Sequence, residues 1–158
     1  WYTDGVKIVT VDIQRFIPGA KSTNYLSAVY ALGIAREQSA VEAIYTDRGD
    51  CLMEGTTTNL FLFKGNKLIT TKKDILPGVT RSVMFELAEG HFEVELRDIQ
   101  KAELTEADEV FITASNKEVV PVVTVDDLTI GDGKPGPKTC QMMQIFRDHT
   151  TAYGQGQF

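Results

Sequence analysis

A lysine and a glutamate stand where a side chain could carry out covalent or acid–base chemistry. Lys21 lies in "GAKSTNYL", between a turn of small residues and a segment with helical spacing. A lysine amine becomes reactive when such a junction holds it and partial desolvation makes its neutral form accessible. Glu54 ends the stretch "CLME" and precedes Gly55 and three threonines, where its carboxylate could contact a protonated ring nitrogen. Taken alone, each residue is better explained as a solvated surface charge.

Two loops have the composition of anion-binding segments. "LPGVTR" (76–81) places consecutive backbone N–H groups ahead of a predicted helix, and a helix N-terminus favours phosphate and other anions. "ITASNKE" (112–118) follows an apolar stretch, and the small residues Ala114 and Ser115 allow backbone amides to approach an anion. Each loop is common by itself. One lysine, one acid and two such loops in one chain are a more restrictive combination.

Other functions find little support in the sequence. His91 and His149 are the only histidines and neither has a partner at metal-ligand spacing, so we expect no metal site. There is no GxSxG elbow, and no serine or cysteine has an obvious base. Sixteen basic against 22 acidic residues give a net charge of −6, which disfavours nucleic acid as a partner. The "RGD" at 48–50 lies between two predicted strands and is interpreted as a turn.

Length and composition indicate one domain in a reducing compartment. The 158 residues are 42% hydrophobic and 24% charged, which is enough apolar material for one core. No apolar run is long enough to cross a bilayer and the N-terminus lacks the regions of a signal peptide, so we expect a cytoplasmic protein without a membrane partner. Cys51 and Cys140 lie far apart without a CxxC pattern, and we interpret them as free buried thiols.

The elements that must position these residues follow from periodicity and turn signals. Strands are expected at 6–13, 41–47, 51–54, 59–63, 91–99, 109–114 and 118–127, the last interrupted by Pro121, with a Gly-Asn hairpin within 61–70. Helices are expected at 25–38, from near Thr80 to just before Gly90, and at 140–153. This irregular mixture predicts an α/β (mixed α+β) domain around a curved sheet, and not a doubly wound nucleotide fold.

The motifs, taken together, resemble a known enzyme class. "KSTNYL", "EGTTTNLF", "ILPGVTR", "EVFITASNKEVVPV" and "IGDGKPGPKT" occur in the order and at the spacing of the fold-type IV pyridoxal-phosphate enzymes. That class contains branched-chain aminotransferases, D-amino acid aminotransferases and aminodeoxychorismate lyases. The resemblance extends from about Arg15 to Tyr153. It implies the larger C-terminal domain of this fold, a curved pseudo-barrel sheet with flanking helices, and pyridoxal 5'-phosphate as the cofactor.

The resemblance also implies a role for individual residues. Lys21 matches the lysine that holds the cofactor covalently and moves a proton, and Glu54 matches the acid that keeps the pyridine nitrogen protonated. Tyr25 matches a tyrosine near the phenolic oxygen of the cofactor. The phosphate-binding positions of the family correspond here to Val79, Thr80, Ala114 and Ser115, and Ser115 and Asn116 correspond to the substrate-binding loop. We do not expect Arg15 to touch the site, although it is near Lys21 in sequence.

Where the sequence departs from the family pattern, substrate preference is less well defined than cofactor binding. Val120 replaces a common threonine, and Asn116-Lys117 replaces a small pair. "NYL" after the lysine favours transamination of branched-chain amino acids with a 2-oxo acid such as 2-oxoglutarate. The alternatives are a D-amino acid aminotransferase, an aminodeoxychorismate lyase, or a catalytically silent remnant that binds partners; retention of Lys21 and Glu54 argues against the remnant.

The resemblance covers one of the two domains of that family. It implies that residues 1–158 form the C-terminal cofactor-binding domain and that an N-terminal domain is absent from this chain. In the family, the N-terminal domain completes the cofactor cleft and contributes to the dimer interface. We therefore expect a homodimer for the complete enzyme and an inactive fragment for this chain alone.

Overall fold

A computed structural model describes residues 1–156 of the chain, in which strands and three α-helices alternate irregularly. The strands are β1 (Val6–Asp12), β2 (Glu42–Thr46), β3 (Cys51–Gly55), β4 (Asn59–Lys64), β5 (Lys67–Thr70), β6 (Glu93–Leu96), β7 (Ile99–Gln100), β8 (Glu109–Ala114), β9 (Glu118–Val125) and β10 (Leu128–Thr129). The helices are α1 (Leu26–Glu37), α2 (Val79–Ala88) and α3 (Pro137–Gly154), and a 3₁₀ segment, η1, spans Lys101–Glu106. The predicted mixed α/β class is confirmed.

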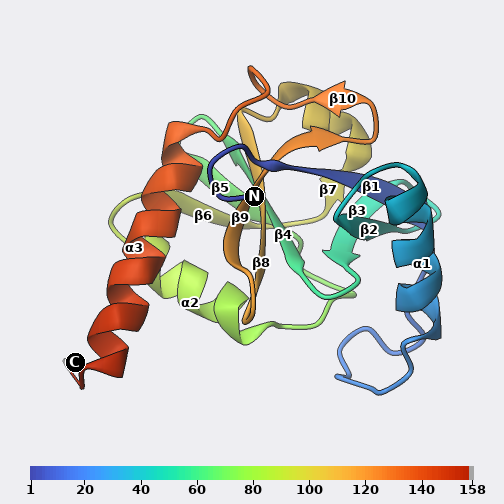
Figure 1. The fold of residues 1–158 in the computed structure, drawn as a ribbon, viewed down its shortest axis with the longest axis horizontal. Helices are drawn as coiled ribbons and strands as arrows, with labels where there is room; N and C mark the ends of the chain where they lie inside the picture. Colours follow the sequence, from blue (N-terminus) through green and yellow to red (C-terminus); the bar gives the residue numbers. More distant parts are fainter. Residues whose placement is uncertain (157–158) are drawn as a thin grey trace.

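Six of these strands close into a ring. The sheet runs in the order β6-β5-β4-β8-β9-β1-β2-β3-β7, and a further pairing joins β3 to β4. That pairing, between Glu54 and Asn59, completes the circuit β4-β8-β9-β1-β2-β3. The helices lie outside the ring, α1 on one side and α2 with α3 on the other (Figure 1). The predicted pseudo-barrel with flanking helices is therefore present.

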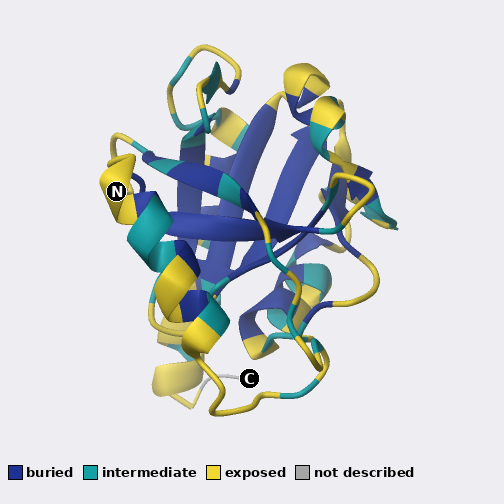
Figure 2. Cartoon of the chain, turned by 90° about the vertical axis from the view of Figure 1, so that its right-hand side faces the viewer, coloured by how far each residue is buried: buried dark blue, intermediate teal, exposed yellow. Residues whose placement is uncertain are grey.

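Side-chain alternation along the strands produces three apolar clusters. On β4, Leu60 and Leu62 belong to the cluster shared by the ring strands, whereas Phe61 and Phe63 belong to the cluster under α2 and α3. Phe61 stacks on Phe111 of β8 with ring centroids 4.9 Å apart. A third cluster packs β1, β2 and β3 against α1. A strand that is covered on both faces is apolar at successive positions. This explains the continuous apolar run in "NLFLF" of β4, and the strands of the ring are accordingly buried in Figure 2.

Most predicted elements are confirmed within a few residues, and the differences have local causes. Pro121 does not interrupt β9, because pairing with β1 begins only at Val122 and leaves that edge free where proline lacks its N–H. The predicted strand 91–99 is divided into β6 and β7. The closing helix α3 begins three residues early, since Glu109 accepts hydrogen bonds from the backbone N–H groups of Lys138 and Thr139.

The two cysteines are free, as expected, but they are not buried. Cys140 is exposed on α3, and Cys51 is only half-buried at the start of β3. The prediction of buried thiols was wrong; Cys140 is not among the residues through which α3 packs, which are Thr139, Met142, Met143 and Phe146. None of the helices in residues 1–156 combines the length and apolarity needed to span a bilayer.

Candidate functional site

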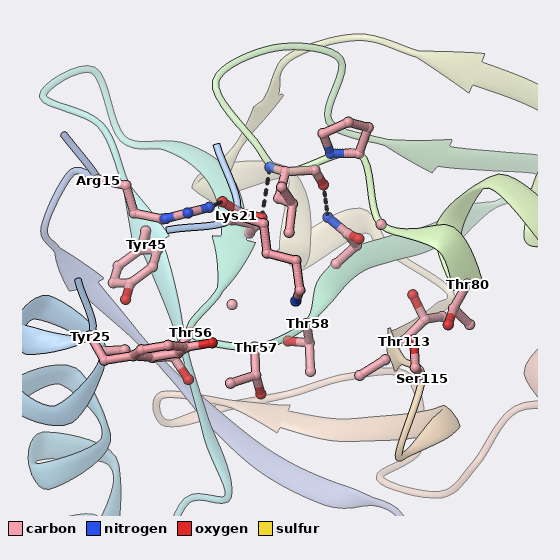
Figure 3. Close-up of a pocket in the computed structure, with 18 of the residues that line it drawn as sticks. Arg15, Lys21, Tyr25, Tyr45, Thr56, Thr57, Thr58, Thr80, Thr113 and Ser115 are labelled. Carbon is pink, nitrogen blue, oxygen red and sulfur yellow. Dashed lines mark hydrogen bonds and ion pairs between the residues drawn. The ribbon is translucent and has the colours of Figure 1, made fainter. Parts of the chain in front are cut away.

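A pocket with a cavity volume of about 440 Å³ opens beside the point where β3 meets β4. It is bounded by the loop before α1, the β3–β4 turn, the start of α2 and the loop after β8 (Figure 3). All the residues to which a role was assigned from sequence line this pocket, namely Lys21, Tyr25, Glu54, Val79, Thr80, Ala114, Ser115 and Asn116. Separate segments of the chain thus bring amine, carboxyl, hydroxyl and backbone N–H groups to one cavity.

Lys21 enters the pocket from a loop between β1 and α1. The residue is exposed, and its side chain points into the cavity toward the β3–β4 turn (Figure 3). The preceding loop is held by Arg15, whose guanidinium donates to the backbone carbonyls of Pro18 at 2.8 Å and Ala20 at 2.6 Å. Tyr25 stands just before α1 on the neighbouring wall. The position of the lysine therefore depends on contacts made by its own loop.

Glu54 is the buried acid of the pocket. Its side chain is only 6% exposed, and one carboxylate oxygen accepts from Arg15 Nη1 at 2.5 Å. The other oxygen accepts from the backbone N–H of Leu76 at 2.9 Å. Burial raises the pKa of Glu54 above its ordinary value, while the hydrogen bonds from Arg15 and Leu76 act in the opposite direction. The result is a carboxylate that is fixed in place and has enhanced affinity for a proton.

The expectation that Arg15 lies outside the site was wrong. The residue lines the pocket and connects Glu54 to the loop that carries Lys21. Its distance from Glu54 in sequence hid the contact, which exists only because β1 and β3 both pair with β2. A cation beside the buried acid is what electrostatics requires, because an unpaired carboxylate at this depth would be strongly destabilising.

The opposite end of the pocket has the properties of an anion site. Helix α2 begins after Gly78, which has no side chain with which to cap the first-turn N–H groups. Thr80 lies in that first turn and lines the cavity. The hydroxyl of Thr113 is buried and finds no hydrogen-bond partner among the described residues. The uncapped N–H groups of α2 and the unpaired hydroxyl of Thr113 are hydrogen-bond donors without an acceptor. A phosphate bound here would provide that acceptor.

Asn59 joins this anion site to the acid. Its side-chain amide donates to the carbonyl of Leu76 at 2.9 Å, and the N–H of the same residue, Leu76, donates to Glu54. A Cβ at position 78 would lie only 2.3 Å from Asn59 Oδ1, so glycine is needed there. The loop before α2 is therefore clamped between the two residues that close the barrel.

Several pocket residues were missed by reading the sequence. Tyr45 is 1% exposed and lines the cavity, and its burial raises the pKa of its phenol. Thr56, Thr57 and Thr58 also line it. The three threonines were a visible signal because they follow Glu54 closely, whereas Tyr45 lies inside an apolar strand that gives no sign of a nearby site.

The contacts of Arg15 can be tested without any ligand. Replacing it in Arg15→Gln removes the charge beside Glu54 and at least one loop contact, so the loop should open more often. We expect trypsin to cleave after Lys21 about tenfold faster than in the unsubstituted protein, because local opening exposes the bond. Mass spectrometry of the fragments measures this rate. The matched control is Arg36→Gln, at an exposed position near the end of α1; equal cleavage in both variants would contradict the role of Arg15.

Comparisons with known proteins agree with this geometry. The family model described as amino-transferase class IV matches residues 4–125. D-alanine aminotransferase of Bacillus licheniformis is 40% identical over 140 residues, covering 86% of this chain and 49% of that protein. Branched-chain amino acid aminotransferase of Escherichia coli superposes with a TM-score of 0.85 at 31% identity, covering 93% of this chain and 52% of that one. A structure of the T.th. branched-chain enzyme with pyridoxamine 5'-phosphate gives a TM-score of 0.87 at 27% identity, over 95% and 53% of the two chains. This chain spans about half the length of such relatives, and it belongs to the class IV aminotransferase family.

Proposed function

We propose that the protein is the cofactor-binding part of an aminotransferase that uses pyridoxal 5'-phosphate. The observation that carries the proposal is the convergence, in one pocket, of an amine, a buried acid and an anion site. These three features correspond to the three groups through which a protein holds this cofactor: its aldehyde, its ring nitrogen and its phosphate. Family membership and the pyridoxamine 5'-phosphate in the T.th. structure support the same cofactor.

Each residue then has a defined task. Bound pyridoxal phosphate acts as an electron sink for charge that develops on a substrate carbon. The carboxylate of Glu54, fixed by Arg15 and Leu76, would keep the ring nitrogen protonated through its negative charge. The first turn of α2, with Val79 and Thr80, would hold the phosphate, and Tyr25, which lines the same pocket, would be available to the phenolic oxygen. The amine of Lys21 would bond to the aldehyde of the cofactor. Once the substrate amine has taken its place there, the freed lysine would move a proton between the substrate and cofactor carbons, as a general base and then an acid.

The proposal is tested by trapping the lysine. Borohydride reduction of the cofactor-loaded protein should place a pyridoxyl group on the peptide that contains "GAKSTNYL". In Lys21→Ala the fold should persist and transamination should be abolished, because a methyl group can neither bond to the aldehyde nor carry a proton. Peptide mapping by mass spectrometry identifies the adduct. Lys72→Ala, at an exposed position outside the pocket, is the control. An adduct confined to other lysines would refute the assignment.

The substrates we propose are an amino acid and a 2-oxo acid such as 2-oxoglutarate, with a branched-chain amino acid as the amino donor. The loop Ala114–Asn116 faces the cavity next to the anion site and is suited to a substrate carboxylate. "NYL" after Lys21 and the similarity to the Escherichia coli branched-chain enzyme support this donor. The 40% identity to a protein named D-alanine aminotransferase supports a second candidate, a D-amino acid.

Paired assays separate the two candidates. The complete enzyme is supplied with L-leucine or D-alanine, each with 2-oxoglutarate, and the 2-oxo acid product is measured. For a branched-chain enzyme we expect kcat/KM to be at least about 10²-fold higher for L-leucine, because Lys21 lies on a fixed side of the cofactor and the chirality at the α-carbon decides whether the Cα–H points toward it. The opposite ratio would assign the protein to the D-amino acid branch.

We further propose that residues 1–158 are a C-terminal domain that acts with a second domain, in a cytoplasmic homodimer. The chain spans about half the length of its relatives. Large apolar side chains in the loop before α1, on α1 and at the start of α2 are exposed, among them Phe16 at 92%, Leu26 at 79% and Val79 at 75%. Exposed apolar side chains of this size are suited to packing against another domain.

This domain proposal predicts how the 158-residue chain behaves by itself. It should fold, self-associate through the exposed apolar residues, bind pyridoxal phosphate weakly and show negligible transamination, because one wall of the cleft is missing. Sedimentation, absorbance titration and a coupled assay provide the three measurements. A longer parent chain should restore turnover. Full activity of the isolated chain would contradict the proposal.

A further inference from the structure

A second buried carboxylate lies directly behind the pocket. Glu42, on β2, has no exposed surface and is not among the residues that line the cavity. Its Oε1 accepts from the N–H of Thr56 at 3.1 Å and from the hydroxyl of Thr56 at 2.5 Å. Its Oε2 accepts from the hydroxyls of Thr57 at 3.1 Å and Thr58 at 3.3 Å. One side chain thus binds three consecutive pocket residues.

The charge of this carboxylate is matched by a lysine from a different loop. Lys117 Nζ lies 3.4 Å from Glu42 Oε2 and 3.2 Å from the hydroxyl of Thr57. The lysine side chain is 18% exposed, so the pair is largely shielded from water. A carboxylate without solvent requires such a partner and a full set of hydrogen bonds.

The arrangement around Glu42 requires a glycine at position 55. A Cβ at Gly55 would lie 2.1 Å from the hydroxyl of Thr58 and 3.1 Å from the carboxyl carbon of Glu42. Any other residue would displace the carboxylate or the threonine loop. The hydrogen bond of 2.7 Å from the Gly55 N–H to the Thr58 carbonyl fixes the same turn, immediately after Glu54.

Through Glu42 and Lys117, two loops that line the pocket are joined. Thr56–Thr58 belong to the β3–β4 turn, and Ala114–Asn116 directly precede Lys117 in the β8–β9 turn. The β8–β9 turn is also held from outside, where the hydroxyl of Tyr2 donates to the carbonyl of Lys117 at 2.9 Å. Both turns are short, since three residues separate β3 from β4 and three separate β8 from β9.

We infer that Glu42 and Lys117 are positioning residues that set the distance between the threonine turn and the Ala114–Asn116 loop, and with it the shape of the pocket. The inference rests on the proposed function, because the ligand whose placement they control is pyridoxal phosphate. Neither residue lines the cavity itself. Their contribution passes through the hydroxyls of Thr56 and Thr57 and through the backbone of residues 114–117.

The test uses Lys117→Met in the complete enzyme. Methionine keeps most of the apolar stem and removes the charge. The matched control is Lys67→Met, because Lys67 also forms a 3.4 Å ion pair, with Glu95, but at an exposed position outside the pocket. Lys117→Arg restores the charge and should recover part of the loss. Two quantities are measured: hydrogen exchange of peptides covering 55–58 and 114–117 without cofactor, and the Kd of pyridoxal phosphate by absorbance titration.

In Lys117→Met we expect faster exchange in both segments and a Kd raised about tenfold, because a small displacement of positioning groups is costly. Lys67→Met should change neither quantity. Unchanged exchange would overturn the inference, and faster exchange with an unchanged Kd would reduce the pair to a structural role and overturn it equally. If the unsubstituted enzyme binds no pyridoxal phosphate, the proposed function fails, and the exchange measurement alone then decides whether the ion pair holds the two loops together.

Discussion

The single pairing of Glu54 with Asn59 is the contact on which the rest of the site depends. It closes the ring of strands, and it does so with the very residue that supplies the buried acid. Its partner, Asn59, holds the loop that leads into α2, so the acid and the anion site are placed by the same closure. A ligand that spans the pocket from the acid to the helix therefore meets two groups whose separation is set by the pairing of Glu54 with Asn59 and by the hydrogen bonds of these two side chains to Leu76.

Two buried carboxylates organise the electrostatics around this closure. Glu54 faces the cavity and is balanced by Arg15, and Glu42 lies behind it and is balanced by Lys117. Each cation comes from a loop that lines or adjoins the pocket. Because a buried charge that loses its partner is strongly destabilising, both loops are held in place by the requirement for charge compensation. The two ion pairs that stabilise the fold thereby also fix the positions of the loops that line the pocket.

The sequence was sufficient to predict most of the elements from local signals, and the family resemblance of its motifs identified part of the pocket lining. Alternation, turn glycines and helix-start loops mark strands and helices, and the motifs around Lys21, Glu54 and Thr80 are contiguous. Contacts between residues distant in sequence could not be predicted in this way. Arg15 meets Glu54 across 39 positions, and Lys117 meets Glu42 across 75. The free edge that accommodates Pro121 likewise depends on where β1 begins.

The parallel pairing of β1 with β9 has a consequence for how the molecule assembles. Val6 pairs with Val122, so the ring joins segments that lie far apart along the chain. Contacts of such long sequence separation form late and slowly, because the entropy of closing the intervening loop must be lost first. On the ribosome, Lys21 and Glu54 emerge long before β8 and β9 are made. Until those strands arrive, the apolar cluster that they share with β1 to β4 is incomplete, and its exposed side chains make the chain vulnerable to aggregation.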